Sequence, residues 1–234
     1  MKKLFPLSLL LLVLASALVV TSPTAAEAQS AGLVSSVLNR MERNRQSLKS
    51  LKASLSMEKY NAQLRDADKY HGVIKYMPAG GRNASVRIDW QKPQQETLAV
   101  ANGKYTLLKP RLNVAYTGSS TSKTVQKNGG GMMDLLYLSR QQLEARFQPV
   151  QDVREETLWG GVSTIHLTLV PKGNQSFKYA EIWVDSAGMP VQTKVVEKNG
   201  DATTMRLSSV ERNARMSADE FKINLDSGVK VIKG

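Results

Sequence analysis

The chain has 234 residues, with 32 lysines and arginines against 20 aspartates and glutamates, and a formal net charge of +12. It has no cysteine, which excludes disulfides, thiolate metal sites and a lipid-modified N-terminal cysteine. So basic a protein favours anionic surfaces, but no zinc finger, helix-turn-helix or aromatic RNA-binding signature occurs, so we expect no nucleic-acid partner. A purely solubilising charge is the alternative interpretation.

The first 28 residues have the layout of a secretory signal peptide. Lys2-Lys3 precedes an apolar run from Leu9 to Val20, and Ala26-Glu27-Ala28 forms an A-x-A cleavage site. We therefore predict a periplasmic protein whose single domain, residues 29–234, is long enough to bury a good core. An uncleaved N-terminal anchor is the alternative.

An amphipathic helix is predicted from Ala31 to Leu51, with Ser30 as its N-cap. Apolar side chains fill most positions of a stripe with helical spacing: Val34, Leu38, Met41, Arg45 and Leu48. The other side of the helix is basic and carries Arg40, Arg43, Lys49 and Lys52. Such a face can rest on an anionic membrane, at about 1 kcal/mol for each charge, although it is more often simply solvated.

Alternating apolar side chains predict three strands after this helix, at residues 51–60, 71–77 and 86–90. The first two are separated by a mostly polar segment, 61–69, which we expect to be a loop. The period of two residues indicates strands that each bury one face.

The stretch from Glu96 to Gly118 predicts a compact meander of three strands. Asn102-Gly103 lies between the first two runs and supplies both positive-φ residues of a type I′ hairpin turn. Pro110 interrupts the ladder because proline has no N–H, and the alternation restarts at Leu112. Such a meander needs a larger sheet around it.

A weakly hydrophobic loop, Gly118–Gly131, then leads into an apolar helix. Its last glycines, Gly129, Gly130 and Gly131, lack the lysine of a phosphate-binding loop and are interpreted as a hinge. The helix is apolar nearly all round, at Met132, Met133, Leu135, Leu136 and Leu138. It must therefore be buried on several sides or cover an apolar cavity. Ser139 is expected to cap a further helical turn that runs to Arg146.

The last third of the chain, residues 150–207, returns to alternating strands, with turns at 159–161, 185–189 and 199–201. A short terminal strand is predicted at 221–225. The whole pattern gives about eleven strands in a mainly β, antiparallel meander with one helical insertion. It favours a strongly curved sheet or an unclosed barrel over a parallel α/β fold.

Nothing in the sequence points to catalysis. His71 and His166 have no cysteine, serine elbow or second histidine at metal spacing, and His166 is expected on the outer face of its strand. Asp66 and Asp68 lack the glycine and glutamate of a calcium loop. We therefore predict no enzyme, metal or cofactor, with a catalytic group assembled only by the fold as the alternative.

The order of these segments resembles the outer-membrane lipoprotein-sorting family, the periplasmic LolA-like lipoprotein carriers. The likeness is carried by RIDWQKP, ETLAVANGKYTLLKPRLNVAYTG, the glycine hinge, MMDLL, HLTLVPK, YAEIWVDSAGMPVQTKVVEKNGDATT and FKINL. The resemblance implies an unclosed antiparallel barrel whose helices cover a concave apolar face that holds lipoprotein acyl chains. It also implies an inner-membrane ABC-type exporter and an outer-membrane receptor as partners. An arginine near the cavity that holds the closed state would correspond to Arg82 or Arg87.

The physical chemistry of lipid transfer agrees with a carrier. A chain of about 15 methylenes gains roughly 0.8 kcal/mol for each buried CH₂, so it needs on the order of 12 kcal/mol of apolar shelter before it leaves a membrane. Methionine tolerates varied shapes, which suits the apolar helix to fill an empty cavity and then swing aside. The predicted cavity wall comprises Leu55, Met57, Ile74, Val86, Ile88, Trp90, Leu98, Val100, Leu107, Val114, Ile165, Leu167, Leu169, Ile182, Val184 and Leu207.

Ordinary core packing is the alternative for each of these residues taken singly. We expect a monomer that carries lipoproteins. The alternatives are a binder of free lipids or glycolipids, and an envelope sensor module with the same fold.

Overall fold

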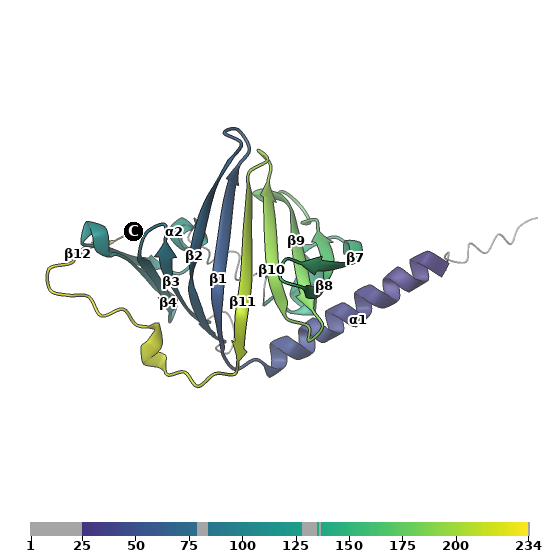
Figure 1. Cartoon of the computed structure of the whole chain (residues 1–234), viewed down its shortest axis with the longest axis horizontal. Helices are drawn as coiled ribbons and strands as arrows, with labels where there is room; N and C mark the ends of the chain where they lie inside the picture. Colours follow the sequence, from purple (N-terminus) through teal and green to yellow (C-terminus); the bar gives the residue numbers. More distant parts are fainter. Residues whose placement is uncertain (1–24, 79–83, 128–134, 136, 234) are drawn as a thin grey trace, which may run out of the picture.

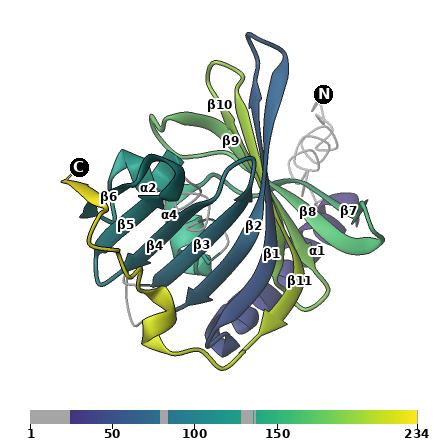
Figure 2. The same ribbon diagram turned by 60° about the vertical axis from the view of Figure 1, so that its left-hand side comes forward.

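The computed structural model describes residues 25–78, 84–127, 135 and 137–233. Its strands form one 12-stranded sheet in the order β12-β6-β5-β4-β3-β2-β1-β11-β10-β9-β8-β7. The sheet curves strongly without closing (Figures 1 and 2), which confirms the mainly β, unclosed barrel. Neighbouring strands are antiparallel, except that β12 lies parallel to β6.

The elements have the following bounds. The strands are β1 (Leu51–Asn61), β2 (Asp66–Met77), β3 (Ser85–Lys92), β4 (Glu96–Ala101), β5 (Lys104–Lys109), β6 (Val114–Ser119), β7 (Gln151–Leu158), β8 (Val162–Leu169), β9 (Phe177–Asp185), β10 (Pro190–Glu197), β11 (Ala202–Arg212) and β12 (Lys230–Lys233). The helices are α1 (Ala25–Ser47), α2 (Lys123–Lys127) and α4 (Arg140–Arg146), with 3-10 turns η1 (Pro110–Leu112) and η2 (Ala218–Phe221).

The meander from β4 to β6 forms as predicted, with one correction. Asn102 and Gly103 have φ angles of 51° and 72°, as the type I′ turn requires. Leu112, however, lies in η1 and is 61% exposed, rather than beginning a strand. The chain leaves η1 through Asn113, which has a left-handed conformation, so β6 begins at Val114.

Three other predicted boundaries are wrong. The loop expected at 61–69 is mostly strand, because β1 and β2 pair continuously from Leu51↔Tyr76 to Asn61↔Asp66 and form a long hairpin (Figure 1). The loop expected after Gly118 contains α2, whose Val125 is buried. The terminal strand expected at 221–225 is absent from the assigned strands, and β12 forms later, against β6.

Helix α1 begins at Ala25, so Ser30 does not cap it. Alanine, glutamate and glutamine, which fill residues 25–29, are strong helix formers and extend the helix backward. Its expected basic face is not uniformly solvated. Arg40 donates to the carbonyl oxygen of Ser186 at 3.3 Å, in the turn between β9 and β10. In the described part of the chain, no helix has the length and apolar character needed to cross a membrane.

The C-terminal segment after β11 crosses the convex face of the sheet toward β12 (Figure 2). Arg87 Nη1 on β3 donates to the carbonyl oxygens of Glu220 at 3.3 Å and Lys222 at 2.9 Å. Lys75 on β2 forms an ion pair with Glu220 at 2.8 Å, and Phe221 between these anchors is buried. Arg87 therefore lies outside the concave face, while Arg82 falls outside the described residues.

Candidate functional site

The concave face of the sheet is a continuous apolar surface built by cross-strand register. Ile74 pairs with Ile88, Ile88 with Leu98, and Leu98 with Leu107, so one side chain from each of four neighbouring strands enters the same row. Every predicted wall residue is buried except Val114 and Ile165, which are partly exposed. The structure thus brings the predicted set to one face, while its binding of lipid stays a prediction.

Two apolar clusters divide this face. One spans β1 to β5, β11 and Val125 of α2, and also includes Leu158, Trp183, Met189 and Val191 near the other end of the sheet. The other lies between α1, α4 and strands β8 and β9, with Leu38, Leu143, Leu167 and Ile182 among its members. The prediction omitted Tyr105 and Met205, both buried in the first cluster. Met205 pairs with the predicted Met57, a pairing that only the fold reveals, whereas Tyr105 could have been found from its alternation with Leu107.

Three described residues between α2 and α4, Leu135, Tyr137 and Leu138, are packed onto the concave face. Tyr137 stacks on Tyr76 of β2, with ring centroids 3.9 Å apart and planes inclined by 2°. Leu135 and Leu138 are buried in the cluster under α1. The other predicted helix and hinge positions, Met132, Met133, Leu136 and Gly129 to Gly131, lie outside the described residues.

Two hydroxyl groups buried at this face lack hydrogen-bond partners among the described residues. They are the Tyr137 hydroxyl and the Thr193 hydroxyl of β10. Burial also raises the pKa of the Tyr137 phenol well above its ordinary value. A buried polar group without a partner costs stability, so the packing over this face is weaker than its apolar area alone suggests.

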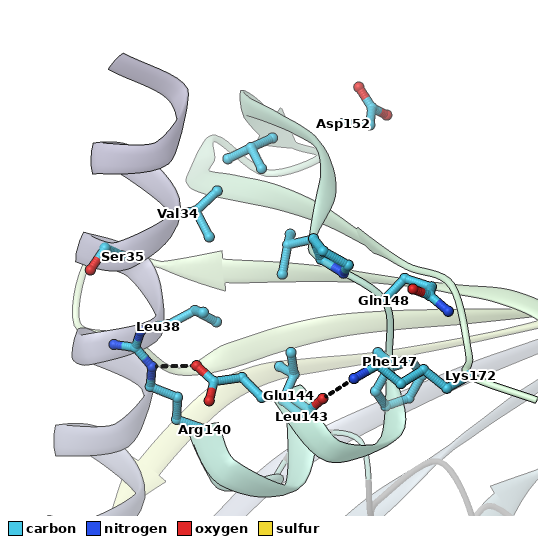
Figure 3. A pocket seen from close by; sticks show the side chains of 13 residues that line it. Val34, Ser35, Leu38, Arg140, Leu143, Glu144, Phe147, Gln148, Asp152 and Lys172 are labelled. Atoms are coloured by element: carbon cyan, nitrogen blue, oxygen red, sulfur yellow. Dashed lines mark hydrogen bonds and ion pairs between the residues drawn. The ribbon is translucent and has the colours of Figure 1, made fainter. Parts of the chain in front are cut away.

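An open cavity of about 690 Å³ lies beside this face, between α1, α4 and β7 (Figure 3). Its apolar lining comprises Val34, Leu38, Leu143, Phe147, Pro149, Val150 and Val153. None of the predicted wall residues lines it. Leu38, Leu143 and Phe147 belong to the cluster under α1, so the cavity is continuous with the apolar layer of the concave face. The helical spacing of Val34 and Leu38 was the available sequence signal.

Helices α1 and α4 are joined beside this cavity. The Arg140 side chain donates to Glu144 at 2.8 Å and to Asn39 of α1 at 2.9 Å. Glu42 of α1 accepts from the Arg140 backbone N–H at 3.3 Å and from Arg45 Nε at 3.1 Å. The hydrogen bonds from Arg45, followed by that from Arg140, lower the pKa of Glu42 to about 2.

Helix α4 starts where the sequence predicted. The backbone N–H of Gln142 donates to Ser139 Oγ at 3.1 Å, and the backbone N–H of Ser139 donates to Gln142 Oε1 at 2.9 Å. This reciprocal pair is a capping box, which satisfies two backbone donors and fixes the start of the helix beside the cavity.

His166 differs from its expected setting. It points away from the concave face, as predicted, but it is fully buried. Its ring nitrogens lie 3.1 Å from the carbonyl oxygen of Asp152 and 3.3 Å from Glu181, and its ring packs on Trp183. The bulge in β7 brings Asp152 over the ring. These contacts describe a structural histidine. No group of three or more potential metal ligands occurs among the described residues.

Comparison with known proteins identifies relatives of this arrangement. The chain matches the family model described as outer membrane lipoprotein carrier protein LolA over residues 46–224. A search of curated proteins finds no match.

Among solved structures, an uncharacterized conserved protein from Thermus thermophilus has a TM-score of 0.55 at 11% identity, covering 86% of this chain and 99% of that one. The structure of MucB has a TM-score of 0.56 at 13% identity, and the match covers 86% of this chain and 66% of the MucB chain. The MucA/MucB complex of Pseudomonas aeruginosa gives 0.51 at 13% identity, with 85% and 62% covered. At such identities the likeness shows a shared fold.

Proposed function

The chain belongs to the LolA family of outer membrane lipoprotein carrier proteins, and from this premise we propose that it is a periplasmic carrier. In this proposal it shelters the acyl chains of a lipoprotein and moves them from the inner to the outer membrane. It takes its cargo from an ABC-type exporter and delivers it to an outer-membrane receptor. Its role is binding rather than catalysis.

The observation that carries the proposal is that side chains from one stretch of chain cover the apolar concave face. Val125, Leu135, Tyr137 and Leu138 come from one stretch of chain and fill an apolar layer that the sheet cannot leave exposed to water. An acyl chain offers the same apolar contact, at roughly 0.8 kcal/mol for each buried CH₂. The Tyr137 hydroxyl, which has no hydrogen-bond partner among the described residues, lowers the cost of opening because it regains water when this stretch leaves the sheet.

Cargo would reach this layer through the cavity between α1, α4 and β7. That cavity is already open and is lined by members of the same apolar cluster. A chain end placed there needs no prior displacement of the segment over the sheet. Further burial can then proceed stepwise, as each methylene replaces a side chain of that segment.

The alternative of an envelope sensor module is favoured by one observation. MucB, which shares the fold at a TM-score of 0.56, is also found in a complex with MucA. A module of this kind would bind a partner protein while its cavity reports lipid. A binder of free lipids or glycolipids is the other alternative, since the open cavity suits a lone acyl chain.

The experiment that tests the proposal is purification from the native periplasm followed by mass spectrometry of bound molecules. We expect triacylated lipoproteins to co-purify, and the purified protein to release lipoproteins from inner-membrane vesicles. Recovery of phospholipid or glycolipid alone would favour the free-lipid alternative. Absence of any bound lipid, together with no release from vesicles, would overturn the carrier.

A matched pair of variants links release to the covering segment. Leu138→Glu places a charge among the buried side chains under α1 and is expected to abolish lipoprotein release. Leu112→Glu changes a side chain that is 61% exposed on η1 and is expected to leave release unchanged. Circular dichroism of both proteins establishes that the sheet is folded. Normal release by a folded Leu138→Glu protein would contradict the proposed role of this segment.

A further inference from the structure

Two cavities meet at the C-terminal end of α4. The larger, of about 690 Å³, lies between α1, α4 and β7, and the smaller, of about 180 Å³, lies between α4 and the segment before β9. Phe147 and Lys172 line both of them. One side chain of this shared wall is apolar and the other is cationic, so the boundary between the cavities is amphipathic (Figure 3).

The larger cavity is suited to a hydrocarbon chain. Its volume lies within the range of about 300–1,000 Å³ that is usual for small-molecule sites. Apolar side chains dominate its lining, and its two carboxylates are neutralised by neighbouring arginines. Glu144 is paired with Arg140 at 2.8 Å, and Asp152 is paired with Arg154. The acidic groups at this cavity therefore present little net charge to a bound molecule.

The smaller cavity has the opposite character. Arg146, Lys172 and Gln175 line it, together with Phe147 and Phe177, and no carboxylate side chain is among its described lining residues. Neither Arg146 nor Lys172 takes part in an ion pair within the part of the chain that the structure describes. Among the described residues no carboxylate neutralises these two cations, and the nearby Glu144 is already paired with Arg140.

Backbone hydrogen bonds place Arg146 and Lys172 next to each other. The Lys172 N–H donates to the carbonyl oxygen of Arg146 at 2.8 Å, and Lys172 Nζ donates to the carbonyl oxygen of Glu144 at 2.7 Å. The N–H of Gln148 donates to the carbonyl oxygen of Val170 at 2.8 Å. These hydrogen bonds join the end of α4 to the segment after β8 and so bring the two exposed cationic residues side by side, with the Arg146 guanidinium carbon 5.9 Å from the centre of the Phe147 ring.

We propose that the two cavities form one site for a single acyl lipid with an anionic phosphate headgroup. The acyl chain lies in the larger cavity, and the phosphate lies in the smaller one, against Arg146 and Lys172. This inference rests on the proposed lipid-carrying function and adds a headgroup preference to it. Guanidinium and ammonium groups donate charge-assisted hydrogen bonds to phosphate, whereas a zwitterionic headgroup would bring its own cation to the same place.

The test uses the purified full chain and vesicles that contain fluorescent phosphatidylglycerol or phosphatidylcholine in their lyso forms, each with the same single acyl chain. We expect phosphatidylglycerol to bind more tightly, by about tenfold. The double variant Arg146→Gln/Lys172→Gln should lose this preference and keep its binding of phosphatidylcholine. The matched control Lys104→Gln/Arg111→Gln removes two exposed charges from β5 and η1, which line neither cavity, and should keep the preference.

A second variant tests the chain cavity. Val34→Trp enlarges a partly exposed side chain at its wall and should weaken binding of both lipids, while its circular dichroism spectrum stays native. Inorganic phosphate added at millimolar concentration should not displace phosphatidylglycerol, because it cannot fill the larger cavity.

The outcomes separate this inference from the proposed function. Three results would overturn the headgroup site alone. The wild type could bind the two lipids equally, the Arg146/Lys172 variant could keep the preference for phosphatidylglycerol, or the control variant could lose that preference. Displacement by free phosphate would also overturn it, since the site would then be a plain anion site. If neither lipid binds, the headgroup site is overturned, while the carrier function is decided separately by the release of lipoproteins from inner-membrane vesicles. A clear preference without lipoprotein release would leave the site standing and refute the shuttling of lipoproteins.

Discussion

Replacing Tyr137 by phenylalanine should stabilise the protein and hold the concave face closed. The Tyr137 hydroxyl is buried without a hydrogen-bond partner among the described residues, a situation that costs about 1–3 kcal/mol. Phenylalanine removes this cost and keeps the ring, whose stacking on Tyr76 at 3.9 Å is worth about 0.5–1.5 kcal/mol. We therefore expect the free energy of unfolding to rise by about 1 kcal/mol.

The same change should slow lipid uptake. Water reaches the Tyr137 hydroxyl both in the unfolded chain and when the segment leaves the sheet. Tyr137→Phe therefore stabilises the closed state by the same free energy relative to the unfolded state and relative to the open state. A gain of about 1 kcal/mol favours the closed state roughly fivefold. Uptake of a fluorescent lipid from vesicles should slow by a similar factor. Tyr137→Ala should have the opposite effect, because it loses both the stacking and the buried ring.

Urea denaturation measures the first effect, as a higher midpoint with an unchanged slope. The matched control is Tyr60→Phe, whose side chain is 39% exposed and whose change in stability should stay within about 0.5 kcal/mol. A Tyr137→Phe protein that is no more stable than the wild type would show that the hydroxyl is satisfied. Faster lipid uptake by that protein would refute the role assigned to the closed segment.

Three further predictions concern the elements around the site. Because the pKa of Glu42 is lowered to about 2, the ionised Glu42 side chain stabilises the folded protein fully above about pH 4.5, and this stabilisation is lost as pH falls toward 2. Glu42→Gln should therefore lower the free energy of unfolding by on the order of 2 kcal/mol at pH 7. In thermal melts the variant and the wild type should converge near pH 2. Gly188→Ala should lower the free energy of unfolding, measured in urea, by about 2–3 kcal/mol, because φ is +83° and the new Cβ would lie 2.3 Å from the carbonyl oxygen of Arg40. The control Gly103→Ala has φ +72° but open space around the new Cβ, and should lower it by only about 1 kcal/mol. Arg87→Ala removes two hydrogen bonds to the C-terminal segment and should speed its proteolysis after β11, while unchanged cleavage would show that the segment is held by other contacts.

The parts of this fold that were predicted correctly depend on residues close together in the chain. The type I′ turn follows from Asn102-Gly103, because those residues tolerate positive φ whatever surrounds them. The capping box follows from Ser139 and Gln142, which are three residues apart. Period-two alternation likewise assigned the wall residues to one face, since successive side chains of a strand point to opposite sides.

The errors arise where distant contacts override such local signals. The polar segment 61–69 reads as a loop, yet pairing with its neighbour extends the strands through most of it. His166 lies on the outer face of its strand, as its alternation with apolar residues predicted, but its complete burial depends on the bulge in β7, which the local pattern does not show. Strand β12 contains only Val231 and Ile232 between two lysines, and it forms by pairing with β6 at the edge of the sheet.

The sequence by itself determined that the chain folds as a curved antiparallel sheet with one apolar face, because alternation and turn chemistry act over a few residues. Only the tertiary structure decided where that apolar layer opens. The cavity requires α1 and α4 to lie against β7, and their contact joins Glu42 to Arg140, 98 residues apart. Arg146 and Lys172 likewise lie next to each other only because backbone hydrogen bonds join α4 to the segment after β8. Contacts at such separations leave no local pattern, because they depend on how the whole sheet curves.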